Sequence, residues 1–164
     1  MDIIPVASSA LKWLFSWLPA SLLRWYYTPE RLAQLIYVDV QPRNQSVYLN
    51  LAPAADFRIA IQVINLSPFT VELDRAKIEL LCGTAPLEAT NLERKRIRAG
   101  EVTSIYFSQV IPDGHAHQIV QNQGFGSASL SGVFEFNCRV QPFARRVPTL
   151  SGLSVSSVNA HLRK

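Results

Sequence analysis

From Leu35 to the end of the chain, hydrophobic residues recur with a period of two, and no other property of the sequence limits its possible folds so strongly. β-Branched and aromatic residues dominate this region, and residues 57–63 alternate cleanly between apolar and polar side chains. Such alternation gives each strand one buried face and one solvated face. Strands are expected at residues 35–40, 47–51, 57–65, 70–81, 102–110, 127–140 and 153–159.

Residues that bend or stop a chain separate these segments, for example around Pro68 and at residues 112–114. Seven short strands with such turns predict a mainly β fold, a seven-stranded antiparallel β-sandwich preceded by N-terminal α-helices. One short helix is expected within the sandwich, at residues 115–123. A chain of 164 residues has room for one such domain and an appendage. We place the appendage at residues 1–36 and the sandwich at residues 37–164.

The first 36 residues are apolar without the period of two. All three tryptophans of the chain lie there, and residues 13–23 contain no charged side chain. The polar residues are four or eight positions apart: Ser8, Lys12, Ser16 and Arg24. On a helix this spacing forms one polar stripe. The segment is therefore expected to be helical and amphipathic.

Two positions should divide this helical segment. Pro19 removes a backbone hydrogen bond and clashes within a helix, so we expect it to separate two helical pieces. Thr28, Pro29 and Glu30 then offer an N-cap side chain, a proline at the first helical position and an acid in the first turn. This pattern predicts that a new helix begins at Thr28.

We expect the N-terminal segment to bind at a membrane interface, where tryptophan and tyrosine are favoured because their rings are apolar at one end and polar at the other. Spanning is disfavoured, since Lys12 and Pro19 fall within any window of about 20 residues. A cleaved secretory signal is also not expected, because the chain begins with an acid instead of basic residues. The expected anchor residues are Trp13, Leu14, Phe15, Trp17, Leu18, Leu22, Leu23, Trp25 and Tyr26. The alternative is that this face packs on the sandwich or on a partner subunit.

Basic residues could add contacts with anionic lipid, because the net charge is +4 and favours acidic surfaces. The densest cluster, residues 93–98, has a solvated strand edge as its alternative interpretation. The possible lipid contacts are Lys12, Arg24, Arg94, Lys95, Arg96 and Arg98. We do not expect nucleic acid as a partner, since no aromatic residues are interleaved with these clusters. If the segment did span, Arg24 and Arg31 would hold the sandwich on the cytoplasmic side.

The sequence contains no recognisable catalytic pattern. A G-x-S-x-G elbow, a P-loop and a dinucleotide-binding glycine motif are all absent, so neither enzymatic activity nor a cofactor is expected. His115 and His117 could provide two metal ligands, but only Asp113 is suitably close in sequence, and no metal site is expected. Cys82 and Cys138 lack C-x-x-C spacing and are expected to be small buried hydrophobes in a reducing compartment, with a disulfide as the alternative.

The segment IAIQVINLSPFTVELD, residues 59–74, carries a family resemblance. Its first strand ends at Asn65, whose side chain we expect to cap a turn containing Pro68 and Phe69. This segment is similar to the core of the type 2 late-embryogenesis-abundant domain, also called the water-stress and hypersensitive-response domain. Gly83 and Gly132 agree with that family in their order along the chain. The resemblance covers about residues 36–158.

The resemblance implies an immunoglobulin- or fibronectin type III-like sandwich without catalysis. Members of the family are stress-protective proteins or membrane-tethered domains, some of them suspected of holding lipid. We therefore expect a membrane-associated interaction module whose sandwich binds a lipid, a protein partner or a sibling subunit. Two other functions stay open, namely a structural subunit whose N-terminal helices insert into neighbouring proteins, and a desiccation-protective protein.

Overall fold

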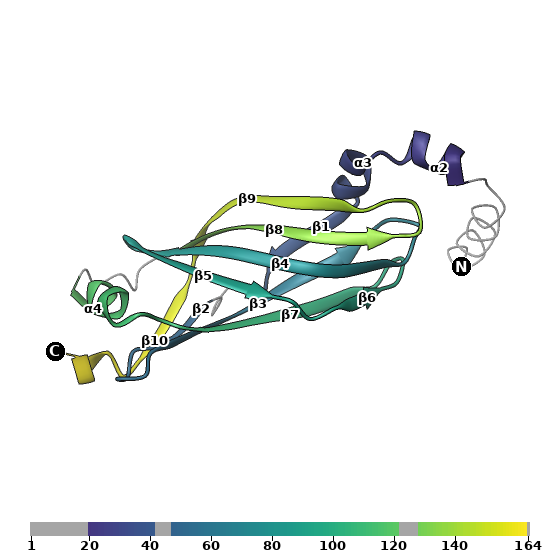
Figure 1. Ribbon diagram of the computed structural model, residues 1–164. Helices are drawn as coiled ribbons and strands as arrows, with labels where there is room; N and C mark the ends of the chain where they lie inside the picture. Colours follow the sequence, from purple (N-terminus) through teal and green to yellow (C-terminus); the bar gives the residue numbers. More distant parts are fainter. Residues whose placement is uncertain (1–19, 42–46, 122–127, 164) are drawn as a thin grey trace, which may run out of the picture.

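The computed structural model describes residues 20–41, 47–121 and 128–163. Two β-sheets lie face to face, with short helices at both ends (Figure 1). The first sheet contains β1 (Ile36–Val40), β2 (Val47–Asn50), β3 (Asp56–Asn65), β7 (Val102–Val110) and β10 (Val155–Val158). The second contains β4 (Val71–Cys82), β5 (Ala85–Asn91), β6 (Lys95–Ile97), β8 (Ala128–Cys138) and β9 (Phe143–Leu153). The helices are α2 (Ala20–Tyr26), α3 (Pro29–Gln34), α4 (Asp113–Gln121) and the 3₁₀ turn η2 (Ala160–Arg163).

The mainly β architecture expected from the sequence is confirmed, but the count of seven strands is wrong, because the described residues contain ten. All seven expected segments form strands, and the expected short helix is α4. The three additional strands, β5, β6 and β9, lie along the two edges of the second sheet. They contain Pro86, Pro148 and several charged residues, which are typical of sheet edges and weaken the alternation of a strand.

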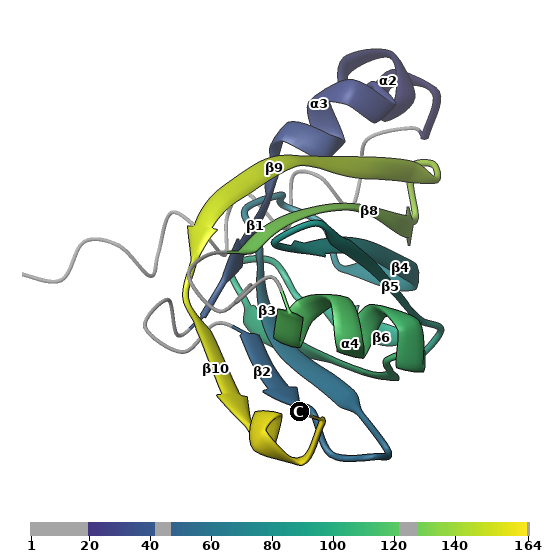
Figure 2. The same ribbon diagram turned by 90° about the vertical axis from the view of Figure 1, so that its left-hand side faces the viewer.

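Each sheet is built around one long central strand. In the first sheet β3 pairs along one side with β7 and along the other with β1 and β2, which follow each other end to end. In the second sheet β4 pairs along one side with β8 and along the other with β5 and β6. These pairings are antiparallel, but β10 pairs with β2 in parallel, so the expectation of a wholly antiparallel arrangement is wrong. Figure 2 shows β9 of the second sheet continuing into β10 of the first.

The core lies between the sheets and follows the alternation of the sequence. Every second residue of β3 is buried, from Phe57 to Asn65, and β4 alternates in the same way on either side of a bulge near Asp74. The rings of Phe107 on β7 and Phe134 on β8 meet edge to face, with centroids 6.5 Å apart, and so join the two layers. Burial of each such side chain contributes about 1.5 to 3 kcal/mol, which makes this interior the main source of stability.

The sheets also meet along one edge, where side chains of the second sheet bind the free carbonyl groups of β7. Asn91 Nδ2 donates to Tyr106 O at 3.0 Å, and Lys95 Nζ donates to Ser104 O at 2.9 Å. An unpaired strand edge can otherwise recruit another chain. These two hydrogen bonds therefore cover polar backbone groups that the sheet itself leaves unpaired.

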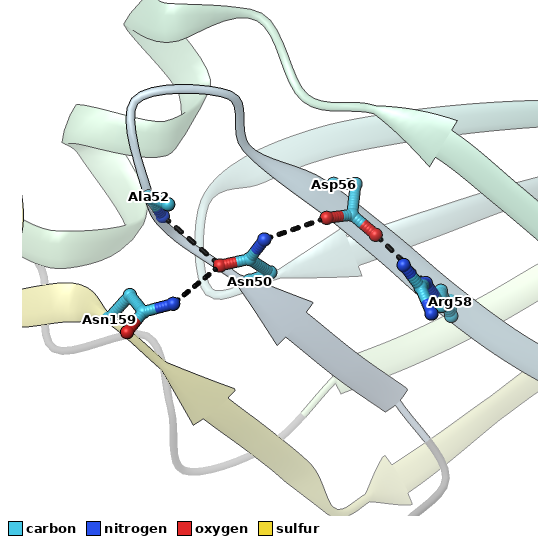
Figure 3. A network of polar contacts seen from close by, with 5 residues as sticks. All are labelled: Asn50, Ala52, Asp56, Arg58 and Asn159. Atoms are coloured by element: carbon cyan, nitrogen blue, oxygen red, sulfur yellow. Dashed lines mark hydrogen bonds and ion pairs between the residues drawn. The ribbon is translucent and has the colours of Figure 1, made fainter.

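A polar network fixes the chain at the end of the molecule that lies far from α2 (Figure 3). Asn50 on β2 donates to Asp56 Oδ1 at 2.9 Å and accepts hydrogen bonds from the Ala52 amide and from Asn159 Nδ2. Asp56 also accepts from Arg58 Nε at 3.0 Å. Asn159 has a φ of 60°, a left-handed conformation that asparagine tolerates better than most residues. The network thus ties the segment after β10 to β2 and β3.

The two cysteines are free thiols at opposite ends of the paired strands β4 and β8. Cys82 lies opposite Ala128, whereas Cys138 lies opposite Val71 at the far end of the same pairing. Such a separation excludes a disulfide between them in this fold. Cys82 is buried, and burial raises the pKa of its thiol to about 12. Cys138 is half-buried.

Only Cys138 should therefore react with iodoacetamide when the folded protein is treated at pH 8, because the reactive species is the thiolate and Cys82 stays protonated. Peptide mass spectrometry after denaturation should find alkylation at both sites. The raised pKa also means that the folded state holds the Cys82 proton more tightly than the unfolded state, so stability should decline as the pH rises from about 9 towards 12. Rapid alkylation of Cys82 in the folded protein would contradict its burial.

Candidate functional site

The helix α3 begins as its sequence predicts. Thr28 is the N-cap, and its hydroxyl accepts a hydrogen bond from the Arg31 amide at 3.4 Å, while Pro29 occupies the first turn. Glu30 lies in the same turn, and hydrogen bonds from its own backbone amide and from Thr28 hold the pKa of its carboxyl below the usual value. The predicted helix start is thus confirmed, and it gives the chain a fixed turn between α2 and α3.

Both helices dock on one end of the two sheets, which together we call the two-sheet body. Leu23 of α2 and Leu32 of α3 belong to the same buried core as the strands. Between the helices, Tyr27 packs edge to face on Phe69, with ring centroids 4.9 Å apart. Burial, and secondarily the neighbouring Tyr26, raise the pKa of the Tyr27 hydroxyl. The N-terminal segment thus contributes apolar residues to the folded core.

Two hydrogen bonds fasten the same helices to the loop between β8 and β9. Arg24 Nε donates to Val140 O at 2.9 Å, and Gln141 Nε2 donates to Tyr27 O at 2.6 Å. The residues concerned are more than 100 positions apart in sequence. Hydrogen bonds in which the donor carries a charge are stronger than neutral ones, so the Arg24 contact should be the firmer of the two. Together they fix the orientation of α2 on the two-sheet body.

The side of α2 that faces away from the core is exposed and apolar. The exposed fractions are 53% for Leu22, 81% for Trp25 and 56% for Tyr26. Arg31 stabilises this arrangement, because its guanidinium lies 5.0 Å from the centroid of the Tyr26 ring and donates to Tyr26 O at 2.9 Å. We call Leu22, Trp25 and Tyr26 the α2 surface.

The anchor residues expected from the sequence thus include exposed residues, one buried residue and several outside the described part of the chain. The α2 surface agrees with the expectation of an outward apolar face, but Leu23 does not, because only 3% of it is exposed and it packs into the protein core. The expected contacts Lys12, Trp13, Leu14, Phe15, Trp17 and Leu18 lie outside the described residues. Within the described residues, no helix has both the length and the apolar character needed to cross a bilayer.

Two arginines of the basic cluster around β6 pair with carboxylates, and the lysine between them points elsewhere. Arg94 pairs with Asp74 at 3.8 Å and Arg96 with Glu72 at 3.1 Å, both carboxylates being on β4. The Lys95 side chain instead donates its hydrogen bond to Ser104 O on β7. The last expected lipid contact in this cluster, Arg98, donates its backbone amide to Glu101 Oε2 at 2.8 Å. Alternation along the strand sends neighbouring side chains to opposite sides, which the dense run of charges in the sequence does not reveal.

The turn that contains Pro68 and Phe69 is organised by one fully buried side chain. Asn65 Nδ2 donates to Phe69 O at 2.7 Å and to Ile97 O at 3.0 Å, while Asn65 Oδ1 accepts from the amide and the hydroxyl of Ser67 at 3.0 and 2.6 Å. The side chain therefore caps its own turn and also ties that turn to the end of β6. The hydrogen bonds of Asn65 hold Phe69 in place against Tyr27, and so support the docking of the helices.

Histidine and the other metal-ligating side chains are dispersed. His115 and His117 both lie on α4, at the end of the molecule away from α2. Within the described ranges, no three side chains of His, Cys, Asp or Glu gather closely enough to hold a metal ion. The α2 surface and the strand ends beneath it are consequently the best-defined candidate site.

Comparison with known proteins shows the fold alone. No family model matches the chain, and no curated protein matches it. The crystal structure of a structural genomics target, SoR45, is 12% identical with a TM-score of 0.51, over 74% of this chain and 87% of that one. A protein from Archaeoglobus fulgidus is 6% identical with a TM-score of 0.45, over 74% and 96% of the two chains. A protein from Arabidopsis thaliana, solved in solution, is 11% identical with a TM-score of 0.43, over 74% and 79%.

Proposed function

We propose that this protein is a non-enzymatic, membrane-associated interaction module in which the α2 end of the two-sheet body faces the lipid. The observation that carries the proposal is the exposure of Trp25, Leu22 and Tyr26 on a helix that is itself fixed to the sheets. An exposed aromatic cluster beside arginine suits the interfacial zone of a bilayer, where rings and guanidinium groups reach both lipid and water.

The position of α2 in the chain supports the same orientation. It directly follows the uncharged apolar run of residues 13–19, which contains two of the three tryptophans. Another exposed apolar side chain, Leu66, lies in the turn organised by Asn65, and its amide donates to Leu35 O, just after α3. The α2 surface and Leu66 thus lie at one end of the two-sheet body, and the apolar run precedes α2 in the sequence.

We further infer that the two-sheet body is an immunoglobulin- or fibronectin type III-like sandwich of the type 2 late-embryogenesis-abundant kind. The turn around Asn65 supports this, as does Gly132 at a site where β8 lies close to β4. In this interpretation the sheets act as a rigid scaffold that presents the α2 surface on one side and binds a lipid or protein partner on another.

Binding to vesicles of phosphatidylcholine alone tests the proposal. The double variant Leu22→Ser/Trp25→Ser should bind at least about tenfold more weakly than the unaltered protein, because each large apolar side chain moved out of water contributes about 1.5 to 3 kcal/mol. Co-sedimentation of the full chain with the vesicles measures the difference. Both residues are exposed, so the variant should unfold at the same urea concentration as the unaltered protein.

The matched control is Leu92→Ser/Tyr106→Ser, which also removes one exposed aliphatic and one exposed aromatic side chain, but from the connection after β5 and from β7 instead of from α2. It should bind vesicles as the unaltered protein does. Equal losses in the two double variants would refute the assignment of the lipid-binding end, and so would undiminished binding of the α2 variant. If neither the unaltered protein nor the variant bound vesicles, and α2 were found buried against another subunit, a structural role in a larger assembly would be favoured.

A further inference from the structure

We propose that the α2 end of the molecule selects anionic phospholipid, through two arginines that flank the exposed aromatic residues. Arg24 lies in the last turn of α2 and Arg31 lies in α3, and both are exposed. Between them in the sequence are Trp25 and Tyr26 of the α2 surface. This inference rests on the proposed function, because it names the kind of lipid that the same surface contacts.

Each of the two arginines is held by a neutral backbone carbonyl group. Arg24 Nε donates to Val140 O at 2.9 Å, and one terminal nitrogen of Arg31 donates to Tyr26 O at 2.9 Å. These contacts orient the guanidinium groups without neutralising them, because a carbonyl oxygen has no net charge. No further hydrogen bond and no ion pair joins either guanidinium to a residue that the structure describes. The remaining N–H groups are therefore available to oxygen atoms of a phosphate, which guanidinium groups bind well.

The described residues of the two helices carry an excess of positive charge. Their charged side chains are Arg24, Arg31 and Glu30. The Glu30 carboxyl accepts hydrogen bonds at the start of α3 and forms no ion pair with any described residue. The cluster around β6 differs, since Arg94 and Arg96 are paired with carboxylates of β4. The two helices thus present positive charge that no carboxylate within the described ranges neutralises.

A lipid surface fits these observations better than a soluble anion. A soluble anion would leave the Trp25 side chain 81% exposed, whereas a bilayer would cover the indole and also supply phosphate groups. Phosphate headgroups lie at the depth of a bilayer where tryptophan and arginine are enriched. The Arg31 guanidinium already lies 5.0 Å from the centroid of the Tyr26 ring, so one contact with the bilayer reaches the α2 surface and this charge together.

The charge of the headgroup tests the proposal. In phosphatidylcholine the choline cation balances the phosphate, whereas phosphatidylglycerol has a net negative charge. The quantity to measure, by co-sedimentation of the full chain at low salt, is the ratio of the affinity for mixed vesicles of both lipids to that for phosphatidylcholine alone. The unaltered protein should prefer the mixed vesicles. In Arg24→Gln/Arg31→Gln the ratio should fall about 25-fold, roughly fivefold for each charge near the bilayer.

The matched control is Arg94→Gln/Arg96→Gln, which lowers the net charge of the protein by the same amount, but at side chains already paired with carboxylates. It should keep the ratio of the unaltered protein. Arg24→Lys/Arg31→Lys retains both charges and should keep most of the ratio. A loss in the lysine variant as large as in the glutamine variant would overturn the proposal, because the arginines would then act only by holding α2 in place.

Three other results would also overturn it. The first is an unchanged ratio in Arg24→Gln/Arg31→Gln, and the second is an equal loss in Arg94→Gln/Arg96→Gln. The third is a ratio that about 1 M sodium chloride does not reduce, since screening at that concentration limits charge interactions to about 3 Å. Soluble glycerol phosphate at millimolar concentration should not displace the protein from the mixed vesicles. Displacement would assign the arginines to a soluble phosphate compound and contradict selection of a lipid.

Failure of this inference and failure of the proposed function give different results. If the unaltered protein bound phosphatidylcholine vesicles and gained nothing from phosphatidylglycerol, the lipid-binding end would stand and the selection of anionic lipid would fall. If Leu22→Ser/Trp25→Ser bound both kinds of vesicle as the unaltered protein does, while Arg24→Gln/Arg31→Gln lost the ratio, the arginines would keep their role. The assignment of the α2 surface to the bilayer would then fall.

Discussion

Replacement of Asn65 by alanine should lower the free energy of unfolding by about 3 to 5 kcal/mol, because several buried polar groups lose a partner at once and each costs about 1 to 3 kcal/mol. The Asn65 side chain is fully buried and makes four hydrogen bonds, to Phe69 O, Ile97 O and two atoms of Ser67. A loss of this size is a large fraction of the roughly 5 to 15 kcal/mol that stabilises a domain. Urea denaturation followed by circular dichroism measures it.

Two further variants show whether the buried amide is responsible. Asn65→Asp keeps the oxygen that accepts from Ser67 but removes the donation to Phe69 O and Ile97 O, so it should be at least as unstable at neutral pH. Asn91→Ala removes two exposed hydrogen bonds, the donation to Tyr106 O and the acceptance from the Glu93 amide, and should cost only about 0.5 to 1.5 kcal/mol, because water can replace both partners. If Asn65→Ala were no less stable than Asn91→Ala, the buried hydrogen bonds of Asn65 would not be a main contribution to stability.

The substitution Gly132→Ala should destabilise the protein by about 2 to 3 kcal/mol, since the added methyl group has no room. A Cβ atom at Gly132 on β8 would lie 2.8 Å from the backbone oxygen of Lys77 on β4, and 3.3 Å from the Ile78 side chain. Backbone atoms of a central strand pair cannot move away without lengthening the ladder of hydrogen bonds between β4 and β8. The midpoint of thermal unfolding should fall accordingly.

The same change at Gly114 is the control. Gly114 lies in α4, and a Cβ atom there would meet nothing within 4 Å. Because alanine favours a helix over glycine by up to about 1 kcal/mol, Gly114→Ala should leave the stability unchanged or raise it. If the two alanine variants unfolded at the same temperature, the close approach of β8 to β4 at Gly132 would not be a constraint on the fold.

The central strands could be predicted from the sequence, but the strands at the edges of the second sheet could not. Strands such as β3 are buried along one whole face, and this gives a strict alternation that can be read directly. The buried residues of β5 are mostly small alanines, while β6 has only Ile97 inside, so neither shows a clear apolar period. The parallel pairing of β10 with β2 could not be foreseen, because it depends on how β9 crosses between the sheets.

The candidate site was predictable in part. The helix start at Thr28 and the capping role of Asn65 depend on local chemistry, and a few neighbouring residues determine them. The burial of Leu23 beside the exposed Leu22 depends on which side of α2 meets the two-sheet body, a tertiary contact without a local signal.

The position of Trp25 in a bound vesicle tests the orientation of the molecule most directly. A full-length variant with Trp13→Phe and Trp17→Phe retains Trp25 as its single tryptophan. Its fluorescence should shift to shorter wavelength on binding to phosphatidylcholine vesicles and should be quenched by lipids brominated near the headgroup, because the indole is exposed on α2 and faces the bilayer. If the protein bound the vesicles while Trp25 stayed unshifted and unquenched, the α2 surface would not be its membrane contact.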